Sequence, residues 1–231
     1  MNPKDRLIVA LDVDSKERAL RLVEELGPHV GMFKVGKELF TAEGPDVVRT
    51  IVAGGGRVFL DLKFHDIPNT VAKAVGSAAQ LGAYFVTLHT GGGRAMLEAA
   101  ASAVPAEGTQ LLGVTVLTSH TDDTLKETGA AGTVKETVHR LALLARECGL
   151  DGVVCSPQEI RLIREAAGDD LLIVTPGIRP KGAAKGDQAR VTTPLEARKM
   201  GCDYIVVGRP ITEASSPKDA AEAIVEELSR G

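Results

Sequence analysis

The sequence has few aromatic residues, with no tryptophan, five phenylalanines and two tyrosines in 231 residues. So few rings leave little surface on which bases or sugars could stack. Neither sign of charge dominates, because 27 Lys and Arg stand against 31 Asp and Glu, for a net charge of −4. The basic residues are scattered rather than gathered in a stripe, which argues against nucleic-acid binding. The composition favours a small, polar or anionic ligand held by charged side chains.

Long apolar runs are also missing. No uncharged stretch approaches the roughly 18 residues that a membrane-spanning helix needs, and residues 1–6 do not resemble a signal peptide. We therefore expect no membrane association and a cytoplasmic location. The three cysteines, Cys148, Cys155 and Cys202, show neither CxxC nor metal-binding spacing, so we expect buried free thiols rather than disulfides or a zinc site.

Short β-branched or apolar runs alternate with segments of helical spacing along the whole chain. One such helical segment is 15–26, and Pro157, Pro194 and Pro217 suit the first turns of others. The pattern predicts one α/β domain covering residues 1–231, without a linker or second domain. The predicted strands are 6–12, 30–35, 57–62, 83–89, 110–117, 151–156, 171–175 and 203–208.

Eight strand–helix units of this length favour a (β/α)8 TIM barrel with parallel strands. An open, doubly wound sheet is the alternative. It is disfavoured because no GxGxxG motif follows the first predicted strand, and the loop after Asp12 contains no glycine to admit a pyrophosphate. In a TIM barrel the functional residues lie at the carboxyl ends of the strands.

Charged residues occur at these predicted strand ends, namely Asp12, Lys34, Asp61 and Lys63. Because side chains alternate along a strand, Asp61 and Lys63 should both point into the barrel while the leucines alternating with them point to the helices. Burying charges costs several kcal/mol each, by general estimates, unless they are paired. An ion-pair network that merely satisfies itself could explain any one of them, but four together favour a functional site.

The segment Asp61-Leu-Lys-Phe-His-Asp-Ile-Pro-Asn-Thr70 resembles the orotidine 5′-monophosphate decarboxylase family, which carries Asp-x-Lys-x-x-Asp-Ile-Pro-Asn-Thr at the end of the third strand. The shorter Asp-x-Lys-x-x-Asp pattern is shared with magnesium-dependent sugar-phosphate relatives, which generally place a glutamate near the position of Lys34. The resemblance extends along the chain through Phe-Lys-Val-Gly, Val-Leu-Thr-Ser, Thr-Pro-Gly-Ile-Arg-Pro, Gly-Asp-Gln-Ala-Arg and Val-Gly-Arg-Pro-Ile.

The resemblance implies a carboxy-lyase that forms uridine 5′-monophosphate and CO2 in the last step of de novo pyrimidine synthesis, with no cofactor and no metal. It implies a homodimer in which Asp66 completes the partner's site, and it makes Lys63 the proton donor beside Asp61. The implied catalytic residues are Lys63, Asp61, Asp66 and Lys34. The implied substrate-binding residues are Asp12, Lys34, Asp61, Ile67, Thr70, Thr118, Pro176, Arg179, Gln188, Gly208 and Arg209.

The residues themselves suit this chemistry. Loss of CO2 from the pyrimidine leaves an electron pair with no adjacent carbonyl to accept it, and an ammonium group can stabilise that charge and then protonate the carbon. Gly208 and Arg209 stand where TIM barrels bind phosphate. Residues 176–194 lack an apolar period, which predicts a loop that closes over substrate. Two alternatives remain, a magnesium-dependent sugar-phosphate lyase and a non-catalytic sensor of a phosphate ligand.

Overall fold

A computed structural model describes residues 1–180 and 192–231 of the chain. Within them, eight parallel strands form a closed barrel in sequence order, with β1 hydrogen-bonded to β8. This arrangement confirms the predicted TIM barrel and rules out the open sheet. The strands are β1 (Leu7–Ala10), β2 (Met32–Gly36), β3 (Val58–Phe64), β4 (Phe85–His89), β5 (Gln110–Val114), β6 (Gly152–Val154), β7 (Leu172–Thr175) and β8 (Tyr204–Val207).

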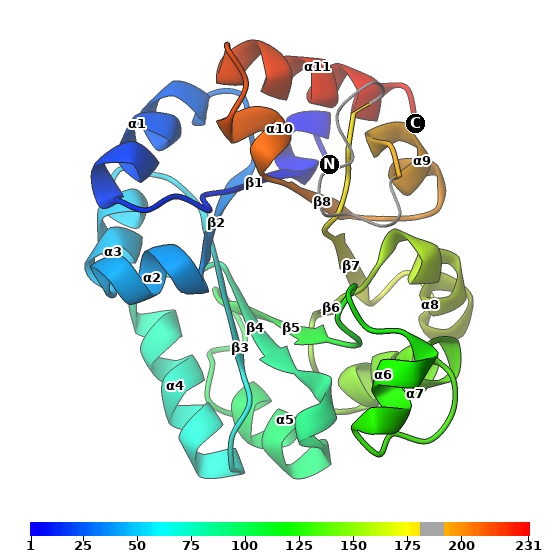
Figure 1. The fold of residues 1–231 in the computed structure, drawn as a ribbon. Helices are drawn as coiled ribbons and strands as arrows, with labels where there is room; N and C mark the ends of the chain where they lie inside the picture. Colours follow the sequence, from blue (N-terminus) through cyan, green and yellow to red (C-terminus); the bar gives the residue numbers. More distant parts are fainter. Residues whose placement is uncertain (181–191) are drawn as a thin grey trace.

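Helices surround the barrel, which Figure 1 shows along its axis. In the described part of the chain, no helix combines the length and the apolar character that crossing a bilayer requires. The α-helices are α1 (Lys16–Leu26), α2 (Lys37–Glu43), α3 (Asp46–Ala53), α4 (Pro68–Gln80), α5 (Arg94–Ala101), α6 (Asp122–Glu127), α7 (Val134–Glu147), α8 (Ile160–Ala167), α9 (Pro194–Lys199), α10 (Arg209–Thr212) and α11 (Pro217–Ser229). Short 3-10 helices are η1 (Pro3–Arg6), η2 (Thr90–Gly92) and η3 (Pro157–Glu159).

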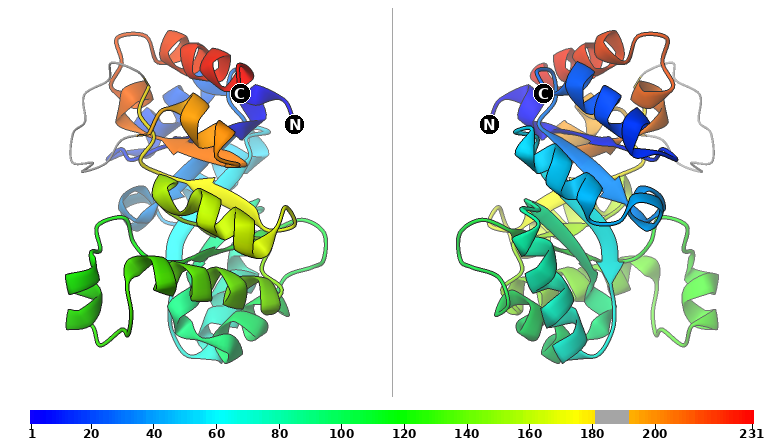
Figure 2. Two further views of the ribbon diagram at one scale, coloured as in Figure 1. Left: turned by 90° about the vertical axis from the view of Figure 1, so that its right-hand side faces the viewer. Right: turned by 90° about the vertical axis from the view of Figure 1, so that its left-hand side faces the viewer.

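Some short helices, α2 and α6 among them, are absent from the sequence prediction. Helix α2 follows β2 directly, because Gly36 ends the strand and caps the helix. Helix α6 lies in the connection from β5 to α7, where a capping box at Thr121 fixes its first turn. It projects from the body of the barrel in Figure 2. Neither helix has enough residues to show a clear apolar period, which explains why both were missed.

The core consists of two apolar layers. A small inner cluster fills the barrel, where Phe85 makes edge-to-face contacts with Phe59 and Tyr204 at ring-centroid distances of 5.9 and 5.2 Å. A larger cluster lies between the strands and the helices. Cys148, Cys155 and Cys202 are buried free thiols, as predicted. Because the inner cluster fills the lower part of the barrel, the space for a ligand lies at the rim.

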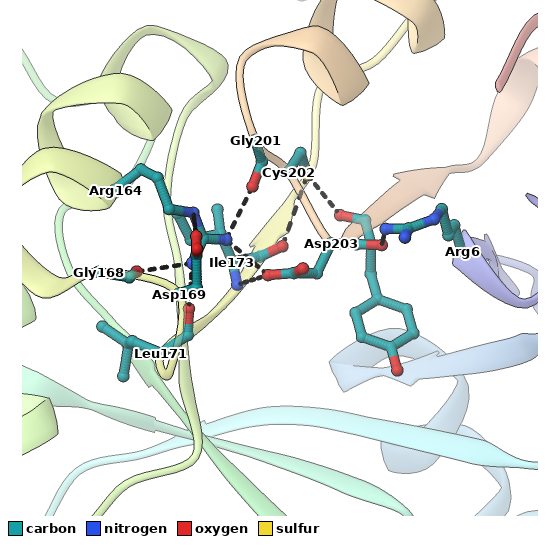
Figure 3. A network of polar contacts seen from close by, with 10 residues as sticks. Arg6, Arg164, Gly168, Asp169, Leu171, Ile173, Gly201, Cys202 and Asp203 are labelled. Atoms are coloured by element: carbon teal, nitrogen blue, oxygen red, sulfur yellow. Dashed lines mark hydrogen bonds and ion pairs between the residues drawn. The ribbon is translucent and has the colours of Figure 1, made fainter. Parts of the chain in front are cut away.

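The opposite end of the barrel is held by the side chain of Arg164, at the end of α8 (Figure 3). Its guanidinium donates hydrogen bonds to the carbonyls of Gly168, Leu171 and Gly201, at 2.8, 3.0 and 2.7 Å. It also donates to a carboxylate oxygen of Asp203, at 2.8 Å. One partly buried cation therefore joins the end of α8 to the segments that begin β7 and β8.

Asp203 strengthens the link to β7 and extends the network to β1. Its carboxylate also accepts a 2.8 Å hydrogen bond from the backbone N–H of Ile173, on β7. Its backbone carbonyl accepts a 3.1 Å hydrogen bond from the guanidinium of Arg6, next to β1. The start of β8 is thus tied to both of its neighbours in the barrel, which makes this end a scaffold for the opposite rim.

We expect Arg164→Met to lower the free energy of unfolding by about 2 kcal/mol, because it leaves three carbonyls and a carboxylate without their cationic donor. Urea unfolding followed by circular dichroism measures this. Arg230→Met is the matched control, since Arg230 forms an exposed ion pair with Glu226 on α11 and should cost less than about 0.5 kcal/mol. Equal losses in the two variants would contradict a scaffolding role for Arg164.

Candidate active site

A cavity of about 310 Å³ opens at the carboxyl ends of the strands. Inner-cluster residues such as Phe59 and Val206 contribute to its lining. A larger hollow of about 740 Å³ adjoins it between the β5–α6 connection and the start of α7, and shares Thr118 and Pro176 with it. Nine residues predicted from the sequence line the smaller cavity, namely Asp12, Lys34, Asp61, Lys63, Thr118, Pro176, Arg179, Gly208 and Arg209.

Four of these residues form a row of alternating charges, which we call the charge chain: Asp12, Lys34, Asp61 and Lys63. The Nζ of Lys34 lies 2.9 Å from Oδ1 of Asp12 and 3.8 Å from Oδ2 of Asp61. The Nζ of Lys63 lies 2.8 Å from each oxygen of Asp61. The residues come from the ends of β1, β2 and β3, so the parallel register of three neighbouring strands brings them together.

The backbone of β3 differs from the regular strand that the sequence predicted. Lys63 has a φ of 55°, and it is the one residue other than glycine with positive φ in the described residues. The register between β3 and β4 also shifts, since Leu60 pairs with Val86 but Phe64 pairs with Leu88. The prediction that Asp61 and Lys63 meet because side chains alternate along a regular strand is therefore wrong in its reason. An irregular strand end brings the two side chains together.

Thr87, on β4, contacts this irregular segment and was missed by the sequence analysis. Its Oγ1 accepts a 2.9 Å hydrogen bond from the backbone N–H of Lys63 and lies 3.0 Å from Oδ1 of Asp61, to which it donates. Its side chain is completely buried. A single threonine in an apolar strand carries no signal that would distinguish it from a packing residue, so only the structure could reveal these contacts.

The electrostatics of the cavity favour an ionised Asp61. Burial tends to raise the pKa of Asp61, but the combined effect of Lys34, Lys63 and the hydrogen bonds from Lys63 and Thr87 lowers it below its ordinary value. His89, at the end of β4, has a pKa lowered by burial and by the nearby His65 and Lys63. The cavity thus combines a fixed carboxylate with ammonium groups beside it.

A second group of predicted residues lies across the cavity from β3. Gly208 follows β8 and lines the cavity, and a Cβ there would make ordinary van der Waals contacts with the Cβ of Ala10 at 3.4 Å and with Asp12 at 3.7 Å. Arg209 begins α10. Arg179 is buried after β7, and its backbone N–H bonds the carbonyl of Thr192. These two guanidinium groups give this side of the cavity the chemistry of an anion site.

Not all predicted site residues reach the cavity. Asp66 and Ile67 lie in the exposed connection from β3 to α4, and Thr70 is exposed in the first turn of α4. All three are outside the lining of the cavity. Asp66 accepts a 2.7 Å hydrogen bond from the backbone N–H of Ile67, whose side chain is 66% exposed. Gln188 and most of the predicted closing loop at 176–194 lie outside the described residues. A single chain therefore does not bring the second half of the Asp-x-Lys-x-x-Asp motif to the charge chain.

Comparisons with known proteins give a consistent result. Residues 5–224 match the model of the "Orotidine 5'-phosphate decarboxylase / HUMPS family". The chain is 54% identical to orotidine 5'-phosphate decarboxylase of Moorella thermoacetica, over 99% of this chain and 94% of that protein. It is 56% identical to the Halorhodospira halophila protein of the same name, over 97% and 96%.

Solved structures agree with these sequence relatives. The crystal structure of orotidine 5'-phosphate decarboxylase from Lactobacillus acidophilus superposes with a TM-score of 0.86 at 44% identity, covering 96% of this chain and 98% of that one. The enzyme of the same name from Pyrococcus horikoshii gives a TM-score of 0.79 at 31% identity, covering 97% and 99%. The similarity therefore extends over nearly the full length of both chains.

The lowered pKa of Asp61 predicts a pH-dependent contribution to stability. A carboxyl whose pKa is lower in the folded than in the unfolded state stabilises the fold fully above about pH 4, and this contribution is lost as the pH falls through the folded pKa. We expect Asp61→Asn to cost about 1–2 kcal/mol at pH 7, less than for a fully buried pair because Lys34 and Lys63 keep some contact with solvent. Urea unfolding between pH 2.5 and 7 measures the difference.

That difference should shrink as the pH falls below about 4, since Asp61 then becomes protonated in the folded protein as well. Asp14→Asn, which removes an exposed carboxylate near the same rim, reports the effect of losing one negative charge. A cost for Asp61→Asn that stays constant over the whole pH range would contradict the stabilising interaction of ionised Asp61 with the two lysines.

Proposed function

The chain belongs to the orotidine 5′-phosphate decarboxylase / HUMPS family, and we propose that it is the carboxy-lyase that converts orotidine 5′-phosphate to uridine 5′-phosphate and CO2. This reaction is the last step of de novo pyrimidine synthesis. The proposal rests on relatives of that name at 54–56% identity and on one observation above all. The ammonium of Lys63 lies in a cavity 2.8 Å from both oxygens of the Asp61 carboxylate, whose side chain is 13% exposed.

The charge on Lys63 accounts for the chemistry. When the bond from C6 of the pyrimidine to the carboxylate breaks, its electron pair stays on C6 and CO2 leaves. A fixed ammonium beside C6 stabilises the developing negative charge without having to reorganise. The same group then transfers one proton from Nζ to C6, which yields the product and leaves a neutral amine that solvent protonates again.

Asp61 supports Lys63 in two ways. Its carboxylate attracts the ammonium of Lys63 and holds it 2.8 Å from both carboxylate oxygens. It also lies where it would approach the carboxylate of the substrate, so that repulsion is relieved as CO2 leaves. Lys34 and Asp12, further along the charge chain, would bind the hydroxyl groups of the ribose, since together they supply donors and acceptors.

The other side of the cavity would hold the phosphate. Arg209 and Arg179 supply guanidinium groups, and Gly208 adds a backbone without a side chain to the same part of the lining. Thr118 and Pro176 line the space left for the pyrimidine. The family resemblance adds Gln188 to the phosphate site, although it lies outside the described residues.

The donor set of the cavity favours a reaction that needs no metal. A magnesium site requires several oxygen ligands around an open position. Here the ammonium of Lys34 lies between the carboxylates of Asp12 and Asp61 and would repel a divalent cation. This arrangement weighs against the magnesium-dependent sugar-phosphate lyases that share the family. A non-catalytic sensor would have no use for the partly buried charges of Lys34, Asp61 and Lys63, since a neutral lining would be less costly.

We further propose that the working unit is a homodimer in which Asp66 of each chain completes the site of the other. The segment around Asp66 is exposed and carries the apolar side chain of Ile67, which a single chain leaves in water. Burying such a side chain is a common feature of subunit interfaces. Thr70, in the first turn of α4, would enter the same interface.

Purified protein should decarboxylate orotidine 5′-phosphate in the presence of excess chelator, as seen by the loss of substrate absorbance. Lys63→Ala should lower turnover by more than about 10³-fold, because the proton donor and its charge are removed, while binding of uridine 5′-phosphate persists. Lys199→Ala, which removes an exposed lysine from α9, is the matched control and should keep wild-type turnover.

Activity that disappears with chelator and returns with magnesium would instead support the sugar-phosphate lyase. Tight nucleotide binding without turnover by the wild-type protein would support the sensor. Near-normal turnover by Lys63→Ala would remove the role proposed for that residue.

Mixing two inactive variants tests the shared site. Lys63→Ala and Asp66→Ala chains, unfolded together and refolded, should recover about a quarter of wild-type activity, because half of a random mixture is heterodimer and each heterodimer has one intact site. Each variant refolded alone serves as the control. No recovery in heterodimers verified by mass spectrometry would show that Asp66 acts within its own chain.

A further inference from the structure

Thr87 lies beneath the charge chain rather than in the cavity. It is on β4 between Val86 and Leu88, its side chain is completely buried, and it is not part of the cavity lining. It cannot touch a substrate in that cavity, so any effect on the reaction must act through its neighbours. Its two hydrogen-bonded neighbours are Lys63 and Asp61, the residues to which the chemistry was assigned above.

The first contact holds the backbone of Lys63. Three residues of β3 lie between the paired positions Leu60 and Phe64, whereas one residue of β4, Thr87, lies between their partners. This excess removes Lys63 from the regular ladder and places it in the left-handed region, with φ 55°. A partly buried N–H needs an acceptor, and the hydroxyl of Thr87 supplies one at 2.9 Å. The side chain of Thr87 thus replaces a strand carbonyl.

The second contact orients Asp61. A hydroxyl has a single proton, and because Oγ1 of Thr87 accepts from the N–H of Lys63, that proton is free to be donated. It is directed to Oδ1 of Asp61, 3.0 Å away, and an ionised carboxylate can only accept. The direction of this relay is therefore fixed from N–H to O–H to carboxylate. Both oxygens of Asp61 then face the Nζ of Lys63, at 2.8 Å each.

We propose that Thr87 is a positioning residue for the reaction, whose hydroxyl fixes the left-handed backbone of Lys63 and the orientation of Asp61 together. The inference rests on the proposed decarboxylase function. The packing of β4 does not require the hydroxyl, because valine has the same shape, suits a buried strand and would leave the apolar contacts in place. The hydrogen bonds with Lys63 and Asp61 account for the presence of a hydroxyl group at this position.

The test compares variants that differ only in the hydroxyl group. Thr87→Val should lower kcat about 10- to 100-fold, the effect of losing a hydrogen bond to a charged group, while KM changes less than about threefold. Thr87→Ser keeps the hydroxyl and should restore kcat to within about threefold of wild type. The control is Thr90→Val, since Thr90 is equally buried and its Oγ1 has no hydrogen-bond partner among the described residues.

The pH profile of kcat/KM supplies a readout that a packing defect would not move. The hydrogen bond from Thr87 is one of the interactions that lower the pKa of Asp61, so its loss should shift the acid limb of the profile to higher pH. The other charged or titratable groups around Asp61 are Lys63 on its own strand, Lys34 on β2, Asp12 after β1 and His89 on β4. All of them are unchanged in the variant.

Thr87→Ser and Thr87→Ala form a second pair, with the same lost methyl group, for the case that Thr87→Val does not fold. An active Thr87→Ser variant beside an impaired Thr87→Ala variant supports the proposal. Equal kcat values and equal acid limbs of the pH profiles in these two variants overturn it. Equal losses in Thr87→Val and Thr90→Val also overturn it. These results are distinct from failure of the proposed function, in which the wild-type protein itself would not turn over orotidine 5′-phosphate.

Discussion

The contact between Lys63 and Asp61 is the interaction on which the rest of the structure depends. Partly removing an ammonium from water is costly, and a carboxylate beside it is needed to offset that cost. Asp61 fulfils this condition with both oxygens, and it is in turn held by Lys34 and Thr87. Each charged side chain offsets the desolvation cost of its neighbour, so the four residues of the charge chain form their contacts together.

A closed barrel is well suited to hold such a unit. Every strand is fixed by two neighbours, so the ends of β1, β2 and β3 cannot separate without breaking hydrogen bonds elsewhere. The inner aromatic cluster fills the space below the rim, and Arg164 and Asp203 secure the opposite end. The end of the barrel that Arg164 and Asp203 hold is thereby separate from the rim that carries the charge chain, as is usual for the two ends of a TIM barrel.

The features of the fold that depend on a local sequence pattern could be predicted from the sequence alone. The eight predicted strands overlap the observed ones because apolar runs and turn residues are local signals, and the residues at their ends follow from the parallel register. The left-handed Lys63 was not predictable, because it depends on the register against β4, which pairs residues more than twenty positions apart. Thr87 was missed for the same reason, and α2 and α6 were missed because they are too short to show a period.

The Asp-x-Lys-x-x-Asp motif divides into two halves with different physical roles. Asp61 and Lys63 lie in the cavity, where their mutual attraction is strengthened by partial burial. Asp66 is three residues further, beyond the left-handed turn at Lys63, and the chain has by then left the barrel. Beyond this bend, Asp66 and the apolar Ile67 are exposed at the surface. In a single chain the backbone therefore places Asp61 and Lys63 in the cavity and Asp66 outside it, and this separation is the reason for proposing that Asp66 acts in the site of a second chain.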